Sequence, residues 1–201
     1  DGTIAIGFYA GAAITSGIGN TAIGYQALDA EDDGDFNTAI GYQALSAQTG
    51  TSGTVANTAI GYQAGLAITT SHYNTLVGYH AGKSITAGAG RSVLIGMRAG
   101  DAMTTSNYNV AIGYEAMLNG TTDKWQVVIG QQAMYNHPAG AASEGTVAIG
   151  YKAMYQSKGS GTGGNVAIGN STAYNITHGA NNVFVGYQSG FTNTVGSQNT
   201  F

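Results

Sequence analysis

The chain has 201 residues, of which 33 are glycine, one is proline and none is cysteine. Its charged residues make up 8% of the chain and its formal net charge is −4. This composition excludes disulfides and thiolate metal sites, and six scattered bases disfavour nucleic acid as a partner. No stretch approaches the roughly 18 consecutive apolar residues of a membrane span, so we expect no membrane insertion by this segment.

A tandem repeat extends over the whole chain. The phrase Asn-Thr-Ala-Ile-Gly-Tyr-Gln-Ala-Leu occurs at 20–28 and again at 37–45, and degenerate copies follow at intervals of 17 to 20 residues. The central glycines of the eleven copies are Gly7, Gly24, Gly41, Gly61, Gly78, Gly96, Gly113, Gly130, Gly150, Gly169 and Gly186. So short and regular a period predicts an all-β stack of about eleven coils, a solenoid. We interpret residues 1–201 as one repetitive segment, a fragment of a longer fibrous protein.

Each copy predicts a short strand that ends at the central glycine, which we number zero. Position −1 is always Ile or Val and position −3 is always β-branched, whereas position −2 is Ala in seven of eleven copies. Residues two apart share a face of a strand, so one face is bulky and the other nearly bare. We expect the bulky face to be packed. The bare face suits close approach of another backbone, either the opposite wall of a flattened coil or a neighbouring chain.

The central glycine is expected to turn the chain with a positive φ, and a second short strand is expected after it. Position +4 changes in blocks along the chain, from Leu28 and Leu45, through Gly65, Gly82 and Gly100, to Met117, Met134 and Met154. In a parallel stack equivalent positions are neighbours, so these blocks favour parallel stacking. For the same reason Arg98 and Glu115, at position +2 of successive copies, should form an ion pair.

The loop at 29–35 contains the densest charge in the chain. Asp29, Glu31, Asp33 and Asp35 have the spacing of the first ligands of a calcium loop, with Gly34 at the sixth position. The twelfth position is Ile40, so the bidentate glutamate is missing. Two interpretations follow: a calcium site, or an acidic loop in contact with solvent. No other cofactor is indicated.

Two columns of aromatic residues stand out when the copies are aligned. Position +5 is aromatic in the last four copies, at Tyr135, Tyr155, Tyr174 and Phe191. If this column faces outward, its rings form a surface on which sugars stack; if inward, it packs between coils. Position −5 is aromatic at Phe36, Tyr73, Tyr108 and Trp125, and these rings are expected to brace the incoming loop.

The repeat resembles two families of fibrous proteins. Asn165-Val166-Ala167-Ile168-Gly169 is similar to the Asn-Ser-Val-Ala-Ile-Gly motif in the heads of trimeric autotransporter adhesins, and the phrase at 20–25 resembles repeats of bacteriophage tail fibres. The resemblance extends over all eleven copies but rests on a short motif. It implies a left-handed parallel β-roll, three chains around a common axis, and a role in attachment.

We therefore expect a structural and adhesive fibre segment, extracellular, in a virion tail fibre or on a bacterial cell surface. Its partners would be two further copies of itself in a homotrimer and a glycan or protein receptor on the host. The alternative is an extracellular shaft or sheath that binds no ligand. No carboxylate pair or activated nucleophile is recognisable in the sequence, so catalysis is not expected.

Overall fold

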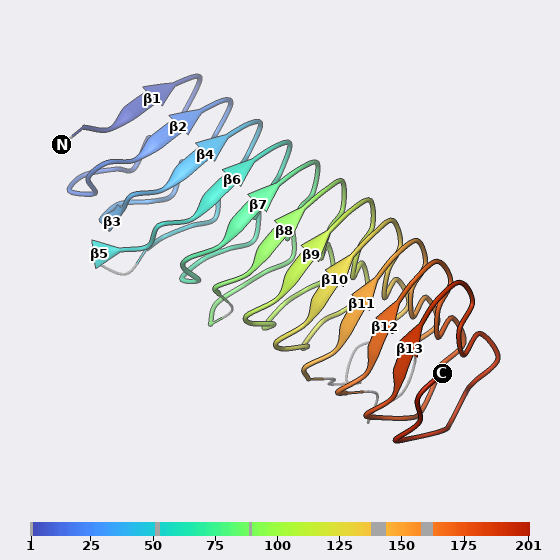
Figure 1. Cartoon of the computed structure of the whole chain (residues 1–201). Helices are drawn as coiled ribbons and strands as arrows, with labels where there is room; N and C mark the ends of the chain where they lie inside the picture. Colours follow the sequence, from blue (N-terminus) through green and yellow to red (C-terminus); the bar gives the residue numbers. More distant parts are fainter. Residues whose placement is uncertain (1, 51–52, 89, 138–143, 158–162) are drawn as a thin grey trace.

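The computed structural model describes residues 2–50, 53–88, 90–137, 144–157 and 163–201. The chain winds into a β-solenoid in which each repeat forms one coil (Figure 1). One parallel sheet follows the length of the rod, with the strand order β1-β2-β4-β6-β7-β8-β9-β10-β11-β12-β13. The all-β parallel solenoid predicted from the repeat is confirmed. Among the residues described, no helical segment has the length and apolarity to cross a membrane.

Every strand of the main sheet has three residues and ends directly before a central glycine. The strands are β1 (Ile4–Ile6), β2 (Thr21–Ile23), β4 (Thr38–Ile40), β6 (Thr58–Ile60), β7 (Thr75–Val77), β8 (Val93–Ile95), β9 (Val110–Ile112), β10 (Val127–Ile129), β11 (Val147–Ile149), β12 (Val166–Ile168) and β13 (Val183–Val185). A second sheet pairs β3 (Gly34–Asp35) with β5 (Gly53–Thr54). The short strands follow from the repeat, which has only three extended residues before its glycine.

Equivalent positions of successive coils lie side by side. In the pair β2 and β4, Thr21 is opposite Thr38 and Ala22 is opposite Ala39, and the same register holds along the sheet. The parallel stacking predicted from the +4 blocks is confirmed. Because neighbouring strands are about 4.8 Å apart, eleven strands make a rod on the order of 50 Å long.

The strands turn their small residues inward and their bulky residues outward. Position −2 is fully buried in ten coils, at Ala22, Ala39, Ala59, Leu76, Leu94, Ala111, Val128, Ala148, Ala167 and Phe184. It packs in one core cluster with the alanines at position +3 of the opposite wall, such as Ala27 and Ala44. The expectation that the bulky face is packed is therefore wrong within one chain. The coil is so flat that mainly alanine fits between its walls. The bare face therefore lies against the opposite wall of the coil and not against a neighbouring chain.

The central glycine is the closest point of contact between coils. Its φ lies between +126° and +142° in every copy, which confirms the expected positive φ. A Cβ atom on Gly113 would lie 2.7 Å from both the carbonyl carbon and the oxygen of Gly130 in the next coil. Any side chain here would meet backbone, so glycine is required both by conformation and by space.

The segment after each central glycine is a turn, and the expected second strand is not formed. Positions +2 and +4 both have a left-handed backbone, for example Gln26 with φ 50° and Leu28 with φ 53°. Two left-handed residues separated by one other residue cannot continue a strand, because extended backbone needs a negative φ at each position. The turn leads the chain back beneath the sheet.

Two interior positions, +4 and +7, share one volume. In ten coils a large residue occupies one of them and a smaller or polar residue the other. The pairs are Leu28/Glu31, Leu45/Gln48, Met117/Gly120, Met134/His137 and Met154/Ser157 on one pattern, and Gly11/Ile14, Gly65/Ile68, Gly82/Ile85, Gly100/Met103 and Ala173/Ile176 on the other. A Cβ atom on Gly82 would lie only 2.8 Å from Cδ1 of Ile85. In seven of these coils the second residue is Gly, Ala or Ser, so one large side chain fills the space; in the other three Glu31, Gln48 and His137 are buried beside the large residue.

A buried ladder of amide side chains at position −4 joins the coils. The Oδ1 atom of Asn20 accepts the backbone N–H of Asn37 at 2.8 Å, and Oδ1 of Asn37 accepts that of Asn57 at 3.0 Å. The Nδ2 group of Asn20 donates to the carbonyl of Gly34 at 2.8 Å. These bonds satisfy backbone groups where the chain enters the strand, which would otherwise be buried without a partner.

The shared volume at +4 and +7 predicts strong coupling between the two positions. Gly82→Met should lower the free energy of unfolding by about 2–4 kcal/mol, because the new side chain overpacks against Ile85. Ile85→Gly should also destabilise, through a cavity. The double variant reproduces the pairing of Met117 with Gly120 and should recover at least about 1 kcal/mol in a double-mutant cycle measured by urea denaturation. Additive effects would contradict the shared volume.

The amide ladder predicts that Asn57→Ala lowers the free energy of unfolding by about 2–4 kcal/mol. Its Oδ1 accepts the N–H of Asn74 at 2.9 Å and its Nδ2 donates to the carbonyl of Ser71 at 2.7 Å, so two buried backbone groups lose their partner. The neighbouring Thr58→Val is the control, because Thr58 faces outward at a position where later coils have Val; it should stay within about 0.5 kcal/mol of the parent. Equal losses in both variants would refute this role.

Candidate functional site

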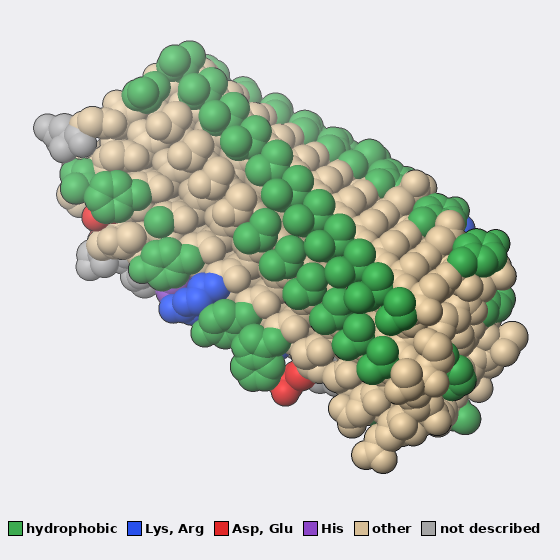
Figure 2. All heavy atoms as spheres, in the orientation of Figure 1, with side chains coloured by type: hydrophobic (Ala, Val, Ile, Leu, Met, Phe, Trp, Pro, Cys, Tyr) green, Lys and Arg blue, Asp and Glu red, His purple; other side chains and the backbone are tan. Residues whose placement is uncertain are grey.

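The outer face of the main sheet is an uncharged surface that extends along the rod. Positions −3 and −1 contain only Thr, Val and Ile in all eleven coils. Their side chains are half-buried or exposed, up to 60% for Ile6. Figure 2 shows hydrophobic side chains in continuous stripes, and a second stripe joins where Val replaces Thr at position −3, from β8 onward. This exposed apolar surface is not part of the core of the rod, and a patch of this extent is typical of an interaction surface.

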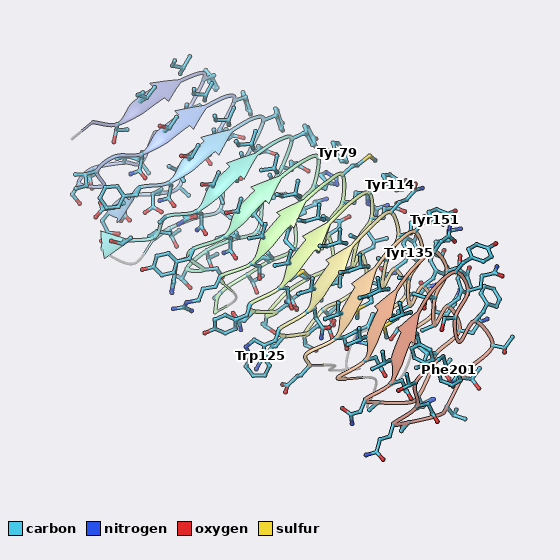
Figure 3. The ribbon with its side chains drawn as sticks, in the orientation of Figure 1. Tyr79, Tyr114, Trp125, Tyr135, Tyr151 and Phe201 are labelled. Carbon is cyan, nitrogen blue, oxygen red and sulfur yellow. The ribbon has the colours of Figure 1, made fainter. Side chains whose placement is uncertain are left out.

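A ladder of stacked tyrosines borders this face at position +1. The rings of Tyr25, Tyr42, Tyr62 and Tyr79 follow one another with centroids 5.1 to 5.2 Å apart and an interplanar angle of 10°. Each ring is 41 to 45% exposed. Tyr79, Tyr114 and Tyr151 lie along the edge of the rod where the strands end (Figure 3).

Position +2 forms a ladder of polar side chains beside the tyrosines. The amide of Gln43 donates to Oε1 of Gln26, and that of Gln63 to Oε1 of Gln43, each at 2.9 Å. Further along, Arg98 donates to Oε1 of Glu115 at 3.2 Å, which confirms the predicted ion pair. Because these bonds run from coil to coil, this column stabilises the stack and offers few free polar groups to a ligand.

The predicted +5 column forms one continuous stack. The rings of Tyr135, Tyr155, Tyr174 and Phe191 follow one another with centroids 5.0 to 5.1 Å apart. All four side chains are half-buried, and their ring faces are turned toward one another. A shallow hollow of about 380 Å³ lies among neighbouring polar side chains, Gln156, Asn175, Thr177, Thr192 and Thr194. Sugar binding at this column stays a prediction, and the geometry presents ring edges more than ring faces.

The −5 column differs from the expectation that it braces the incoming loop. Tyr73 and Tyr108 are each 45% exposed and Trp125 is 53% exposed, so these rings do not pack into the rod. Trp125 projects from the edge of the rod opposite Tyr79, Tyr114 and Tyr151 (Figure 3). Its ring stacks on that of Tyr108 with centroids 6.3 Å apart. Alignment revealed this column, but only the fold showed that it points into solvent.

The structure brings together only part of the predicted calcium ligand set. Carboxylate oxygens of Glu31, Asp32 and Asp33 lie within 4.8 Å of one another, and this group does not include Asp29 or Asp35. The carboxylate of Asp35 instead accepts the backbone N–H of Ile18 in the preceding coil at 2.8 Å. The spacing in the sequence did not identify Asp32 as a member of this group. It did include Asp35, which instead lies in strand β3, paired with β5.

Glu31 is the unusual member of this acidic group, because its side chain is buried. Its Oε1 atom accepts the backbone N–H groups of Gly34 at 2.8 Å and Asp32 at 3.1 Å. Burial raises the pKa of Glu31, and these two hydrogen bonds oppose the rise. Partial desolvation and the charge of Asp32 also raise the pKa of Asp33. Glu31 therefore already has a structural task, and calcium binding stays a prediction.

A second buried titratable group lies inside the coil of β10. Nε2 of His137 lies 2.9 Å from Oδ1 of Asp123, and Nδ1 lies 3.3 Å from Oγ of Ser157. The contacts from Asp to His to Ser resemble the catalytic triad of a hydrolase, but all three side chains are at most 1% exposed and so cannot reach a substrate. The group therefore joins two walls of the rod. Sequence spacing missed it because Asp123 and His137 lie at −7 and +7 of one copy and meet only when the coil closes.

Comparison with known proteins gives no relative: no protein family, no curated protein and no solved structure matches the chain. The function is therefore inferred from the geometry described above and from the motif resemblance.

The buried carboxyl of Glu31 predicts a stability that depends on pH. Because its pKa is raised above the ordinary value of 4.5 in the folded state, the folded protein holds this proton more tightly than the unfolded chain. Stability is then lost as the pH rises above the ordinary value. Glu31→Gln keeps an oxygen for the N–H of Gly34 and should raise the Tm at about pH 7, with the difference vanishing below about pH 4.

Thermal unfolding followed by circular dichroism at several pH values checks this expectation. Asp32→Asn is the comparison: it removes a charge that also raises the pKa of Glu31, but burial is the larger cause, so its Tm should rise less than that of Glu31→Gln. A Tm of Glu31→Gln equal to or below that of the parent at neutral pH would refute it. Added calcium chloride tests the metal site in the same experiment, because a bound ion would raise the Tm of the parent and not of Glu31→Gln.

Proposed function

We propose that this chain is a structural and adhesive segment of an extracellular fibre, either a viral tail fibre or a bacterial surface adhesin, which attaches to a host surface. The observation that carries the proposal is the rod itself. A solenoid whose coils repeat at a fixed spacing has a length set by the number of its repeats and a side surface on which individual positions vary freely. Spanning a distance and presenting side chains along it are what a fibre requires.

The outer face of the main sheet supports self-association. In an isolated rod, two columns of Val, Ile and Thr would stand in water along the full length, and a +1 column that is mainly Tyr, broken by Met97, Gln131 and Asn170, would stand beside them. Eleven strands about 4.8 Å apart, over about four residues of 3.3 Å each, give roughly 700 Å² per chain or about 1,400 Å² in a contact between two chains, the size of a stable interface. The face has no charged residue, so identical copies meet without repulsion.

A homotrimer of left-handed coils is the assembly that the motif resemblance implies. Three rods that turn their sheets toward a common axis would cover the apolar stripes and leave the −5 and loop positions outside. A purely structural shaft is the second candidate. The regularity of the amide, glutamine and tyrosine ladders favours it, because these columns act between coils and require no ligand.

Self-association through the sheet predicts that one charge in its centre disrupts the assembly. Ile112→Glu should convert a trimer into monomers, because symmetry places the same carboxylate in every copy at the interface. Sedimentation velocity measures the mass, and circular dichroism verifies that the fold is kept. Thr105→Glu adds the same charge at an exposed loop position and should remain trimeric. A monomeric parent chain would exclude the trimer.

A further inference from the structure

The column at position −5 places large side chains where the backbone disfavours them. Tyr73, Arg91, Tyr108 and Trp125, in four successive coils, all have a left-handed backbone with φ between 56° and 62°. Of the other coils, four have a residue suited to that conformation, namely Gly19, Gly145, Gly164 and Asn181, whereas Phe36 and Ala56 are not suited to it. A bulky L-residue is disfavoured there, since its Cβ crowds the following carbonyl. Local conformation therefore does not account for these four residues.

Burial does not account for the three rings either. Tyr73, Tyr108 and Trp125 are about half exposed. Trp125 lies on the edge of the rod opposite Tyr79, Tyr114 and Tyr151 (Figure 3), and Tyr108 stacks on it. Neither the core nor the proposed sheet interface uses the three rings.

Left-handed residues at +2 and +4 have structural roles, since Gln26 bonds to the next coil and Leu28 is buried. The −5 rings differ from them because they are exposed, and exposed residues in a disfavoured backbone are expected where a protein binds something.

Arg91 forms the centre of this column. Its guanidinium carbon lies 5.5 Å from the ring centroid of Tyr73 and 5.6 Å from that of Tyr108, so the two rings cover its faces. The N–H donors lie in the plane of the guanidinium and point away from the rings. Within the described parts of the chain, no carboxylate forms an ion pair with Arg91. These donors are held in place and are free to bind a ligand.

Trp125 ends the column with an open face. One side of its ring stacks on Tyr108, and the next coil has Gly145 at the equivalent position. A Cβ atom on Gly145 would meet nothing within 4 Å among the residues that the structure describes, and glycine has no side chain to cover the indole from this position. Lys124 precedes Trp125 and pairs in the backbone with Glu144, which precedes Gly145. One basic and one acidic residue thus precede the column positions of these two coils.

From this arrangement we propose that Tyr73, Arg91, Tyr108 and Trp125 form a carbohydrate-binding site for a pyranose oligosaccharide that lies along the rod. A sugar ring has an apolar face that stacks on the indole, and its hydroxyl oxygens can accept hydrogen bonds from the guanidinium of Arg91. Four coils at about 4.8 Å place the first and last residues about 14 Å apart, which suits a short oligosaccharide.

The charge of the site favours a glycan over single-stranded nucleic acid. Nucleic acid requires a groove with many cations along its backbone, whereas this column has two bases next to Glu144 in a chain of net charge −4. The inference rests on the attachment role proposed above, and it concerns a different surface from the +5 column.

The only tryptophan of the chain reports directly on this site, because Trp125 is its terminal platform. Chitohexaose, cellohexaose, maltohexaose and a heparin-derived hexasaccharide are titrated into the intact chain. At least one of them should shift the emission to shorter wavelength with saturation, as a sugar covers the exposed indole. Tyr108→Asn and Arg91→Asn should weaken that binding by at least about tenfold, since central aromatic and arginine anchors dominate an interface.

Asparagine tolerates the left-handed backbone, so both variants should keep the Tm of the parent. The matched control is Phe36→Asn, at position −5 with the same left-handed backbone but outside the four coils of the site, which should bind as the parent does. The site is overturned if Tyr155→Asn in the +5 column loses binding while Tyr108→Asn keeps it, or if an oligo-dT strand displaces the sugar or binds in its place. It is also overturned if no probe alters the emission.

Adhesion of the labelled chain to host cells separates this inference from the proposed function. Loss of adhesion in Tyr108→Asn, with Phe36→Asn unaffected, supports both. Adhesion that persists in Tyr108→Asn and Arg91→Asn overturns the site but leaves the attachment role standing. If the parent chain neither adheres nor binds a sugar, both fail, and the shaft that binds no ligand is the remaining function.

Discussion

Close parallel stacking of backbone on backbone is the constraint on which the rest of the structure depends. From Gly7 to Gly169, every central glycine lies against the glycine of the next coil so tightly that a single Cβ atom would not fit. This contact holds the strands in register, and register places every residue directly above its equivalent. Columns of amides, tyrosines and glutamines follow from it, because like side chains then meet at the spacing at which they bond or stack.

The flatness of the coil is a second consequence. Walls that approach this closely leave room for alanine at −2 and +3, so the larger side chains of the strand must point outward. What remains of the interior is a small volume that positions +4 and +7 share, and different coils fill it from opposite sides, as Met117 with Gly120 and Gly82 with Ile85 show. The core is thin, and much of the cohesion between coils comes from hydrogen bonds that pass from each to the next.

A rod of this kind has surfaces with different tasks. The outer sheet face is uniform, apolar and uncharged, which suits contact with copies of the same chain. The −5 edge is irregular, since it alternates between glycine and large exposed residues in a strained backbone. Uniform columns stabilise the stack, and a ligand is best recognised where the columns are broken, as at the step from Trp125 to Gly145.

The sequence by itself determined the solenoid, its period, the register of its strands and the need for glycine at position zero, because each follows from spacing along the chain. Arg98 and Glu115 could be paired for the same reason. Only the tertiary structure decided which face of each strand lies inside, since a period of two defines two faces without saying which is buried. It alone brought Asp123 to His137, separated Asp35 from Glu31 and turned Trp125 outward. The distance between these residues depends on how each coil turns back on itself. Left-handed residues such as Gln26 and Leu28 determine that turn, and the spacing of residues in the sequence does not predict it.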